Sequence, residues 1–375
     1  MKVFIQSIVA QLLLNPYIFW RGRAALPAKK CWRVPFALLF IAELLVYFFG
    51  FIFRNELPDE VMIPIQLICN TWYIASIYIT ICLLAMEAVR ISEKFFHWLP
   101  QAITGHWAEA KLTMFFAITI GVSCLMVKAY LTVAHPIVKD VYITLPKGSS
   151  QRDSMKVVMM SDLHIGEVIG KKMVKRYVTL SNAQHPDMVV VVGDIMDYES
   201  RLAEKAHIED DLKKLEAPLG VYAVNGNHEY RANRFAKYRW IAKTGMTHLI
   251  DSVVQPDSTF LLVGRDDRVN RGRKSLHTLL KGQDTSKPVI VLDHQPFISF
   301  DELVMNGVDL GLHGHTHNGQ LWPYPLLMKL IYECPYGYHR RGPTQFYVSS
   351  GIGVAGPPYR VGTVSELVVL HIRFK

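Results

Sequence analysis

Apolar residues are concentrated near the start of the chain, in long uninterrupted runs. Three runs, Val34–Phe53, Ile65–Met86 and Leu112–Val133, are 20 to 22 residues long, and an α-helix needs about 20 residues to cross the hydrocarbon core of a bilayer. An earlier run over residues 3–20 is interrupted by Asn15-Pro16, so it is either a fourth, weaker span or an interfacial helix. The pattern predicts a transmembrane region over residues 1–135 with three or four helices, at about 3–20, 34–53, 65–86 and 112–133.

Beyond residue 135 the pattern changes to short apolar runs separated by polar segments. The runs are Met155–Met160, Asp187–Val192, Gly220–Val224, Phe260–Val263, Val289–Leu292, Val308–Leu312, Phe346–Ser349 and Leu367–Ile372. The polar segments with helical character are Lys171–Ala183, Arg201–Glu216 and Arg234–Thr244. Short, fully apolar strands rich in β-branched residues are typical of sheets covered on both faces. We therefore predict an α/β domain over residues 155–375, joined to the transmembrane region by a linker over residues 136–154.

Composition and charge support this division. Half of the 375 residues are hydrophobic and 19% are charged, which excludes a disordered chain. Residues 1–135 carry 11 Lys or Arg and 7 Asp or Glu, whereas residues 136–375 carry 30 and 25. The net charge of +9 favours anionic partners, and membrane lipid fits as well as nucleic acid. Five cysteines over this length exclude a disulfide framework.

The loops between the apolar runs predict how the chain lies in the membrane. The loop Arg21–Arg33 holds five basic residues and the loop Glu87–Lys111 holds three, whereas the loop Arg54–Met62 holds one Arg and three acids. By the positive-inside rule the first and third of these loops are cytoplasmic, which places the C-terminal domain outside the cytoplasm. Glu43 lies in the middle of a span and is either a functional carboxylate or a hydrogen-bonded residue of the bundle.

Side chains that suit metal ions follow directly on five of the apolar runs. They are Asp162, His164, Asp194, Asn227, His228, His294, His315 and His317. The carboxyl ends of the strands are the edge of an α/β sheet at which ligands bind, so we expect these side chains to meet on one rim. Each motif alone also fits a turn, a helix cap or a pair of residues at a strand end, but the combination favours a metal site.

The chemistry of this set favours two ions rather than one. Carboxylates, imidazoles and one amide, without a thiolate, suit Mn, Fe, Zn or Co. About seven ligands in two groups suit a pair of ions roughly 3.5–4 Å apart that share a carboxylate, and such a pair lowers the pKa of a bound water and clamps the oxygens of an in-line displacement at phosphorus. The sequence therefore predicts an enzyme that hydrolyses a phosphoester by in-line attack of a metal-bridging hydroxide.

Three sequence motifs strengthen this interpretation. They are Ala-Pro-Leu-Gly-Val-Tyr-Ala-Val at 217–224, Gly-His-Thr-His-Asn-Gly-Gln-Leu-Trp-Pro at 314–323 and Tyr-Val-Ser-Ser-Gly-Ile-Gly at 347–353. With them, roughly residues 156–372 resemble the calcineurin-like metallophosphoesterase superfamily, and in particular its membrane-anchored bacterial branch. The resemblance implies a four-layer α/β/β/α sandwich. It also implies a multi-pass protein of the bacterial inner or plasma membrane.

The resemblance implies a role for each site residue. Asp162, His164 and His317 would hold the first metal ion, Asp194 would bridge, and Asn227, His294 and His315 would hold the second ion. His228 would face the leaving group as a general acid or as a stabiliser of the transition state. Independently of the resemblance, Asp197 and Asp293 are candidate hydrogen-bond acceptors behind the ligands, although a place on the surface fits Asp197 equally well. Glu229 is expected to be structural. The chain departs from the branch at Asn318, where Gly is more usual, and at His313, where a small residue is more usual.

The substrate is the least constrained part of the prediction. Arg231, Arg340 and Arg341 are candidates for binding phosphate, although solvated surface charge explains such arginines equally well. The segment Leu321–Tyr338 is very apolar for a loop beside the His315 and His317 motif. It is either packed on the domain core or a lip that touches the bilayer or an acyl chain. A membrane-tethered site with such a lip fits a lipid-linked phosphate or pyrophosphate better than a soluble nucleotide. The predicted substrate is a phosphodiester or a lipid-linked phosphate.

The sequence is also compatible with two other functions. One is a pyrophosphohydrolase of a nucleotide-diphospho-lipid such as UDP-2,3-diacylglucosamine, which needs access from the cytoplasmic leaflet and so conflicts with the predicted topology. The other is a non-catalytic membrane scaffold with a relict domain, which should have lost at least one ligand. The membrane tether disfavours nucleic acid as a substrate, and the sequence leaves the oligomeric state open.

Overall fold

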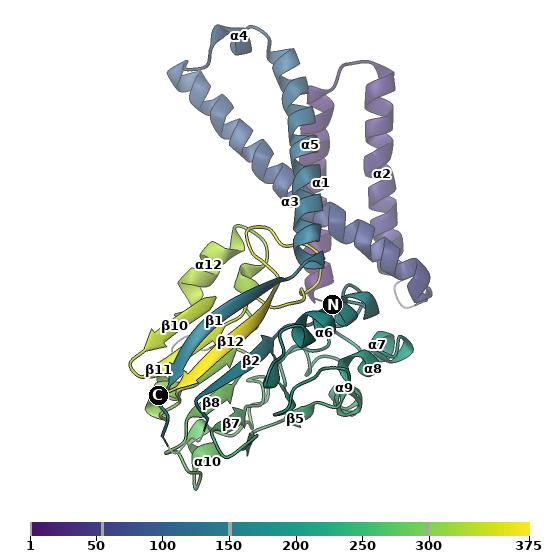
Figure 1. Cartoon of the computed structure of the whole chain (residues 1–375). Coiled ribbons are helices and arrows are strands. Elements are labelled where there is room, and N and C mark those ends of the chain that lie inside the picture. Colours follow the sequence, from purple (N-terminus) through teal and green to yellow (C-terminus); the bar gives the residue numbers. More distant parts are fainter. Residues whose placement is uncertain (1, 54–55, 149–151, 297–299) are drawn as a thin grey trace. The chain divides into compact units, whose positions relative to one another are not determined.

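The computed structural model describes residues 2–53, 56–148, 152–296 and 300–375. The chain divides into two compact units, Met1–Lys128 and Ala129–Lys375. The first unit is helical and the second is built on two β-sheets (Figure 1).

The helices of the first part are α1 (Lys2–Ala25), α2 (Lys30–Ile52), α3 (Asp59–Phe96), α4 (Gln101–Thr104) and α5 (Trp107–Ala134). Among the described residues, three helices are long and apolar enough to cross a membrane, namely Lys30–Gly50 of α2 and the whole of α3 and α5. These three correspond to the three long apolar runs of the sequence. The choice between three and four spans, which depends on α1, stays a prediction.

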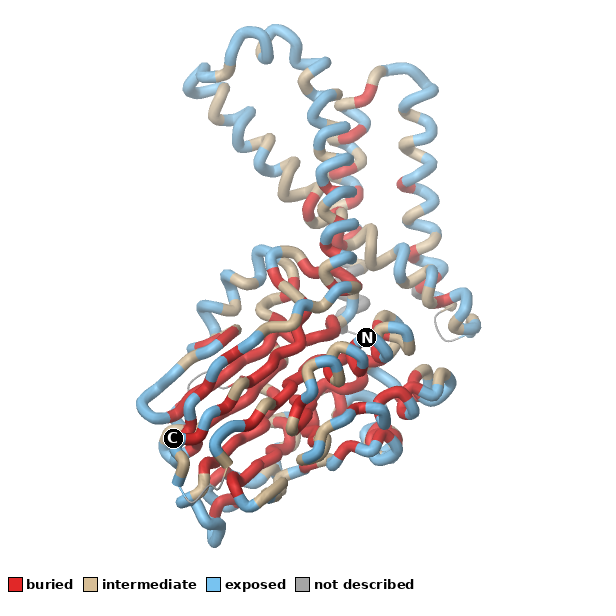
Figure 2. The backbone as a smooth tube through the Cα atoms, in the orientation of Figure 1, coloured by how far each residue is buried: buried red, intermediate tan, exposed pale blue. Residues whose placement is uncertain are grey.

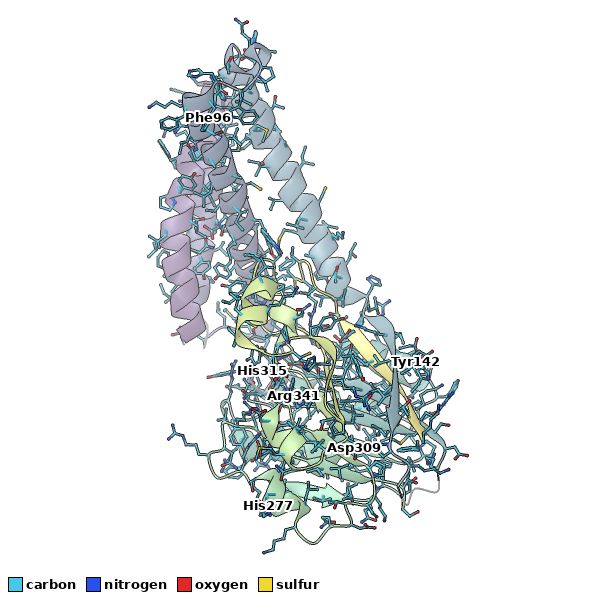
Figure 3. All side chains as sticks on the ribbon, turned by 90° about the vertical axis from the view of Figure 1, so that its left-hand side faces the viewer. Phe96, Tyr142, His277, Asp309, His315 and Arg341 are labelled. Carbon is cyan, nitrogen blue, oxygen red and sulfur yellow. The ribbon has the colours of Figure 1, made fainter. Side chains whose placement is uncertain are left out.

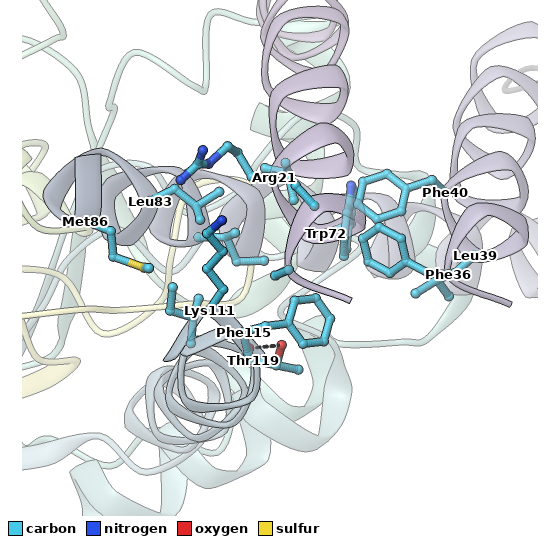
Figure 4. Close-up of a pocket in the computed structure, with 16 residues that line it drawn as sticks. Arg21, Phe36, Leu39, Phe40, Trp72, Leu83, Met86, Lys111, Phe115 and Thr119 are labelled. Atoms are coloured by element: carbon cyan, nitrogen blue, oxygen red, sulfur yellow. Dashed lines mark hydrogen bonds between the residues drawn. The ribbon is translucent and has the colours of Figure 1, made fainter. Parts of the chain in front are cut away.

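Polar groups inside the helical unit bind one another. The side-chain amide of Asn15 donates to Glu43 at 2.9 Å, and the indole N–H of Trp72 donates to Asn15 at 2.9 Å. Glu43 is therefore hydrogen-bonded within the bundle. The unit also contains an apolar pocket, to whose lining Arg21 and Lys111 add two basic groups (Figure 4).

The second unit contains two six-stranded sheets. The first sheet contains, in spatial order, β1 (Ile137–Leu145), β12 (Glu366–Phe374), β2 (Ser154–Met160), β3 (Met188–Val192), β4 (Val221–Val224) and β5 (Thr247–Leu249). The second sheet contains β10 (Gly337–Arg341), β11 (Thr344–Val348), β9 (Leu310–His313), β8 (Val289–Leu292), β7 (Leu261–Gly264) and β6 (Ser252–Val254). Strands β2 to β5 run parallel to one another, as do β7, β8, β9 and β11.

Alternating side chains of the strands fill three separate hydrophobic layers. In β3, Val190 and Val192 pack toward the second sheet, whereas Val189 and Val191 pack against the helices on the other face. The strand β8 alternates in the same way between the inter-sheet core and an outer core. Burial on both faces explains why these strands are continuous apolar runs in the sequence, and Figure 2 shows the strands as the most buried part of the domain.

Helices cover the outer face of each sheet. The first sheet carries α6 (Lys171–Asn182), α7 (Arg201–Lys205), α8 (Glu209–Leu212) and α9 (Arg234–Ile241), followed by the 3₁₀ turn η1 (Ala242–Thr244). The second sheet carries α10 (Leu276–Leu280) and α11 (Asp301–Met305). The 3₁₀ turn η2 (His317–Gly319) and the helix α12 (Tyr324–Ile331) follow β9. These layers confirm the expected α/β/β/α sandwich.

Two details differ from the sequence prediction. Residues 137–145, assigned to the linker, form strand β1, which pairs parallel with β12. Only alternate side chains of its second half, Val141, Ile143 and Leu145, are buried, so this edge strand has no apolar run that would have marked it. Residues 149–151 of the predicted linker lie outside the described residues. The predicted helix Arg201–Glu216 is two short helices, separated where the backbone of His207 turns to a positive φ of 49°.

Candidate metal centre

The predicted site residues lie in the loops that follow β2, β3 and β4 of the first sheet and β8 and β9 of the second. The carboxyl ends of strands from both sheets therefore meet, rather than those of one sheet alone. Three groups of ligand atoms form there, each with its atoms within 4.8 Å of one another. The groups are Asp162 with His164 and His317, His164 with Asp194 and His228, and Asp194 with His294 and His315.

Asp194 stands between the histidines of the two sides. Its Oδ2 atom lies 3.6 Å from His164 Nε2 and 3.2 Å from His294 Nε2. On the first side, His317 Nε2 lies 3.1 Å from His164 Nε2 and 3.3 Å from Asp162 Oδ1. Two imidazole nitrogens aimed at each other beside carboxylate oxygens are an arrangement that a shared cation stabilises. The carboxylate of Asp194 is placed to serve two such positions.

Three buried polar atoms of the candidate ligands have no hydrogen-bond partner within the described part of the chain, although burial ordinarily requires one. They are His164 Nδ1, Asn227 Oδ1 and His294 Nε2, and the last of these lies 3.2 Å from the carboxylate of Asp194. The other ring nitrogen of His294, Nδ1, lies 2.8 Å from the carbonyl oxygen of Val192, which holds Nε2 toward Asp194. A backbone acceptor behind the ring is the usual support of a metal-binding histidine. The donor set therefore fits a divalent cation.

The backbone of the centre is held in an uncommon conformation. Five of the candidate ligands have a positive φ, between 48° and 69°, although none is glycine. They are Asp162, His164, Asp194, His315 and His317. A non-glycine residue in the left-handed region costs on the order of 1–3 kcal/mol and persists only where its surroundings enforce it, often at functional sites. Asn318 has a φ of 49°, which explains why glycine is favoured at this position and why asparagine is tolerated.

Glycines beside the ligands let the loops approach closely. A Cβ atom on Gly226 would lie 2.1 Å from Asp194 Oδ1, and one on Gly314 would lie 2.4 Å from Asp162 Oδ2. Both distances are too short for any side chain. The glycines of the Gly-Asn-His and Gly-His-Thr-His motifs are thus required because the carboxylates occupy the space that a side chain would need.

Glu229 fixes the loop that carries Asp194. Its fully buried carboxylate accepts four backbone N–H groups, from Asp194, Ile195, Met196 and Gly226, at 2.7 to 3.0 Å. The structural role expected for Glu229 is therefore that of a clamp between the loops after β3 and β4.

Replacing Glu229 by glutamine tests this clamp. In Glu229→Gln, the NH₂ group of the new side chain would face two of the four backbone N–H groups, which would then lack an acceptor. Each unsatisfied buried donor costs about 1–3 kcal/mol, so we expect the free energy of unfolding to fall by about 3 kcal/mol. Thermal unfolding of the full chain in detergent micelles measures the loss. Glu199→Gln, at an exposed position, is the matched control, and equal melting temperatures for the two variants would contradict the clamp.

His228 is oriented by Asp197. Its Nδ1 lies 2.8 Å from the carbonyl oxygen and 2.9 Å from the carboxylate of Asp197, whereas its Nε2 lies 3.9 Å from Asp194 Oδ2. Burial opposes ionisation of Asp197, but the imidazoles of His164 and His228, whose Nδ1 atoms lie 3.6 and 2.9 Å from its carboxylate, outweigh burial and hold the pKa of this carboxyl below its usual range. Arg231 Nη1 lies 3.5 Å from His228 Nδ1. The tether on Nδ1 leaves Nε2 facing the centre.

Three of the candidate ligands have pKa shifts toward the protonation state that binds metal, whereas Asp162 and His294 are shifted the other way. Burial raises the pKa of Asp162, and the carboxylates of Asp194 and Asp162 outweigh burial and hold the pKa of His294 well above its usual value. Burial opposes ionisation of Asp194 as well, but His294 and His164 hold its pKa well below the usual range, so the carboxylate is ionised. Burial lowers the pKa of His315 to about 3 and holds that of His317 well below its usual value. Both imidazoles are neutral at pH 7, and the neutral ring is the form that coordinates a cation.

The other residues singled out in the sequence have partners of their own. Arg341 forms ion pairs with Asp301 and Glu333, and Arg340 donates to the carbonyl oxygen of Gly342. Arg341 ends the edge strand β10, whereas His315 follows β9. Both residues are labelled in Figure 3. These partners of Arg340 and Arg341 are not predicted metal ligands. Arg231, by contrast, lies beside His228 of the centre.

Asp293 is the other residue predicted to accept hydrogen bonds behind the ligands. It is buried and accepts hydrogen bonds from Arg273 at 3.1 Å and from Arg265 at 3.4 Å. Its carbonyl oxygen lies 2.6 Å from His313 Nδ1, which gives this unusual histidine a place in the core. Burial lowers the pKa of His313 to about 4, so its ring is neutral.

Sequence reasoning missed two groups around the centre. The buried side chain of Arg360 donates to the carbonyl oxygens of His317, Ser350 and Gly353 at 3.2, 2.5 and 2.9 Å. The amide of Gln295 donates to both carboxylate oxygens of Asp267, at 2.9 and 3.0 Å. Arg360 is 43 residues from His317 in the sequence, and no spacing signal links the two. Asp267 follows the apolar run of β7, so its position after a strand is a signal that could have found it.

Comparison with known proteins agrees with this geometry. Residues 155–319 match the model of the family described as calcineurin-like phosphoesterase. An Aquifex aeolicus metallophosphoesterase is 32% identical over 62% of this chain and 88% of its own length. The chain belongs to the calcineurin-like phosphoesterase family. It is thus a metallophosphoesterase, a hydrolase of phosphoesters.

Relatives of this metallophosphoesterase also match over its helical part. A Campylobacter jejuni metallophosphoesterase is 28% identical over 97% of this chain and 96% of its own length. A zebrafish (Danio rerio) protein named transmembrane protein with metallophosphoesterase domain is 27% identical over 99% of this chain and 89% of its own length. The three apolar helices and these relatives agree in indicating membrane association of the metallophosphoesterase.

Proposed function

We propose that this metallophosphoesterase is a membrane-anchored two-metal enzyme that hydrolyses a phosphodiester or a lipid-linked phosphoester. The observation that carries the proposal is the position of the Asp194 carboxylate, one oxygen of which lies within 3.6 Å of histidine nitrogens on both sides of the centre. A carboxylate between two groups of neutral donors is the arrangement that two adjacent cations require.

The two metal positions use the two sides of the centre. Asp162, His164 and His317 would hold one cation. Asn227, His294 and His315 would hold the other, and Asp194 would contribute to both. When bound, a pair of divalent cations such as Mn, Fe, Zn or Co supplies a water of lowered pKa and polarises the phosphoryl oxygens. The buried Asn227 Oδ1 atom, which has no hydrogen-bond partner in the described part of the chain, supports the second position.

His228 provides the proton for the leaving group. Asp197 holds its ring through Nδ1, and Nε2 faces the centre. A ring protonated on both nitrogens donates the Nε2 proton to the departing oxygen and becomes neutral, and Asp197 stabilises the cationic ring before the transfer. Arg231, beside His228, binds a phosphate oxygen or the second ester group of the substrate.

The charged loops support a location outside the cytoplasm. Five basic residues lie in the loop 21–33 and three in the loop 87–111, so these loops remain on the cytoplasmic side of a bacterial inner or plasma membrane. An uneven number of crossings after the first loop then places the second unit on the outer side. This topology favours a lipid phosphoester over a nucleotide-diphospho-lipid that is made in the cytoplasm.

Hydrolysis by the full chain in detergent micelles tests the proposal. We expect a Mn²⁺-loaded protein to cleave bis(p-nitrophenyl) phosphate, to lose this activity with EDTA and to regain it with added Mn²⁺. The monoester p-nitrophenyl phosphate in a parallel assay separates monoesterase from diesterase activity. If the wild type is no faster than Asp194→Asn on either substrate, the proposal is wrong.

A further inference from the structure

The segment that follows the His315 and His317 motif is unusually apolar and exposed. The helix α12 (Tyr324–Ile331) has no buried residue, and four of its side chains are large, apolar and exposed, as is the preceding Trp322. They are Leu326, Leu327, Leu330 and Ile331. A contiguous apolar patch of this kind is uncommon on a soluble surface and marks an interaction site.

The aromatic residues of this segment indicate the kind of partner. Trp322, Tyr324 and Tyr338 are exposed, and Lys329 projects from the same helix. Tryptophan and tyrosine are enriched where a protein meets the boundary between lipid and water. A short helix with apolar residues, aromatic rings and a basic residue is the composition of an interfacial helix that lies in the membrane surface.

The fold ties this segment to the end of a membrane-spanning helix. The last residues of α5, Ala129–Ala134, belong to the same compact unit as the two sheets. The backbone N–H of Arg360 donates to the carbonyl oxygen of Ala129. The next residue, Val361, forms a β-bridge with Leu321 and accepts the N–H of Trp322 at 2.8 Å. The start of α12 is therefore a few residues from the end of α5.

The length of α5 then gives the position of α12 relative to a bilayer. The apolar run Leu112–Val133 has 22 residues, about the length that crosses the hydrocarbon core. Its end, with Tyr130 and Leu131 exposed, lies at the boundary between lipid and water. Since β1 begins at Ile137, there is no long linker to separate the domain from that boundary. The exposed face of α12 is consequently near the membrane surface.

The metal centre is fixed to the same segment at two points. A Cβ atom on Gly319 would lie 2.6 Å from the backbone nitrogen of Pro325, so the turn that carries His317 packs directly on the start of α12. After α12, the hydroxyl of Thr316 donates to the carbonyl oxygen of Pro335 at 2.6 Å. The position of α12 thereby determines the position of the loop with His315 and His317.

We propose that α12, together with Trp322, docks the catalytic domain onto the lipid bilayer and so directs the metal centre toward phosphoesters at the membrane surface. The docking stands on the exposed apolar side chains and on the connection to α5. The statement about the substrate class rests on the proposed function. The partner is the bilayer itself, rather than the helices of the first unit or a second copy of the chain.

A fluorescent label on α12 tests the docking without any activity. The five cysteines are replaced by alanine in the full chain, and an NBD label is attached at Leu330→Cys or, as the matched control, at Met305→Cys of α11. Both native side chains are 84% exposed. In nanodiscs of phosphatidylethanolamine and phosphatidylglycerol, we expect the label at 330 alone to shift to shorter wavelength and to be quenched by lipids with brominated acyl chains.

Two results of the labelling would overturn the docking. A label at position 330 with the emission of the control label would mean that α12 is in water. A label at position 330 that is shifted but not quenched by brominated lipid would mean that protein covers α12, from the helices of the first unit or from a second copy.

A pair of matched substrates tests the direction of the centre toward the membrane. Phosphatidyl-p-nitrophenol in the nanodisc and bis(p-nitrophenyl) phosphate in water release the same product. We expect Leu330→Glu to lower kcat/KM for the lipid diester about tenfold, because it replaces a large apolar side chain at the bilayer by a charge, and to leave the soluble diester and the melting temperature unchanged. Met305→Glu should change neither.

The outcomes separate this inference from the proposed function. An equal ratio of the two rates in wild type and Leu330→Glu overturns the role of α12 in substrate access. An absence of hydrolysis of both diesters by the wild type instead overturns the proposed function, and the labelling result decides the docking by itself.

Discussion

Replacing Asp194 by asparagine is expected to lower kcat/KM for bis(p-nitrophenyl) phosphate at least about a thousandfold, because several kcal/mol of transition-state stabilisation depend on the cations that this carboxylate joins. The substitution keeps the size of the side chain and its acceptor for the backbone N–H of His228, which lies 2.8 Å from Oδ1. It removes the negative charge between His164 and His294. Bound metal, measured by mass spectrometry after removal of free ions, should fall together with the activity.

The control for Asp194→Asn is the same chemical change at an exposed site. Asp284 is exposed and accepts the hydroxyl of Ser286, and Asp284→Asn should retain both activity and metal content. Activity of Asp194→Asn within tenfold of the wild type would show that the carboxylate does not join two cations.

Replacing His228 by glutamine is expected to give a different signature. Removal of a general acid lowers kcat about 10²–10⁴-fold. The metal content should not change, because His228 Nε2 lies 3.9 Å from Asp194 Oδ2, farther than the Nε2 atoms of His164 and His294. The loss should be larger for a diester with an alkyl leaving group than for one with p-nitrophenol, because the poorer leaving group depends more on the donated proton.

The metal content of His228→Gln decides between two roles for this histidine. His228 also forms one of the three-residue groups with His164 and Asp194, so a ligand role is the competing interpretation. A loss of metal in parallel with the loss of activity would establish that role and exclude the general acid. His277→Gln, at an exposed residue of α10 that lies away from His315 in Figure 3, is the matched control and should resemble the wild type.

The predictability of each strand from the sequence depended on how many of its faces are covered. Strand β8 was predicted at its observed bounds, Val289–Leu292, because both faces are buried and the run is wholly apolar. The edge strands β1 and β10 were missed, since one face of each contacts solvent and their polar residues conceal the strand. The strands β5 and β6 have three residues each, too few to show any period.

The candidate site was more predictable than the edges of the sheets. Each metal-binding type of residue followed an apolar run, so the rule that ligands gather at the carboxyl ends of strands was sufficient to collect them. The residues that hold these ligands in place could not be predicted by this rule. Arg360 acts through backbone carbonyl groups of residues that are far away in the sequence, and a carbonyl group has no sequence signature. Distances between the loops after β3 and β8 likewise depend on how the two sheets pack.

The order of strands in the first sheet has a consequence for biosynthesis. Strand β12, at the very end of the chain, lies between β1 and β2, which are the first two strands to be made. Because β12 is synthesised after the other strands of this sheet, β1 lacks its partner and β2 keeps one edge open until β12 has left the ribosome, although β3 can already pair with the other edge of β2. A nascent chain that stalls before residue 366 would expose both of these edges, and quality-control proteases would have a means of distinguishing it from the finished protein.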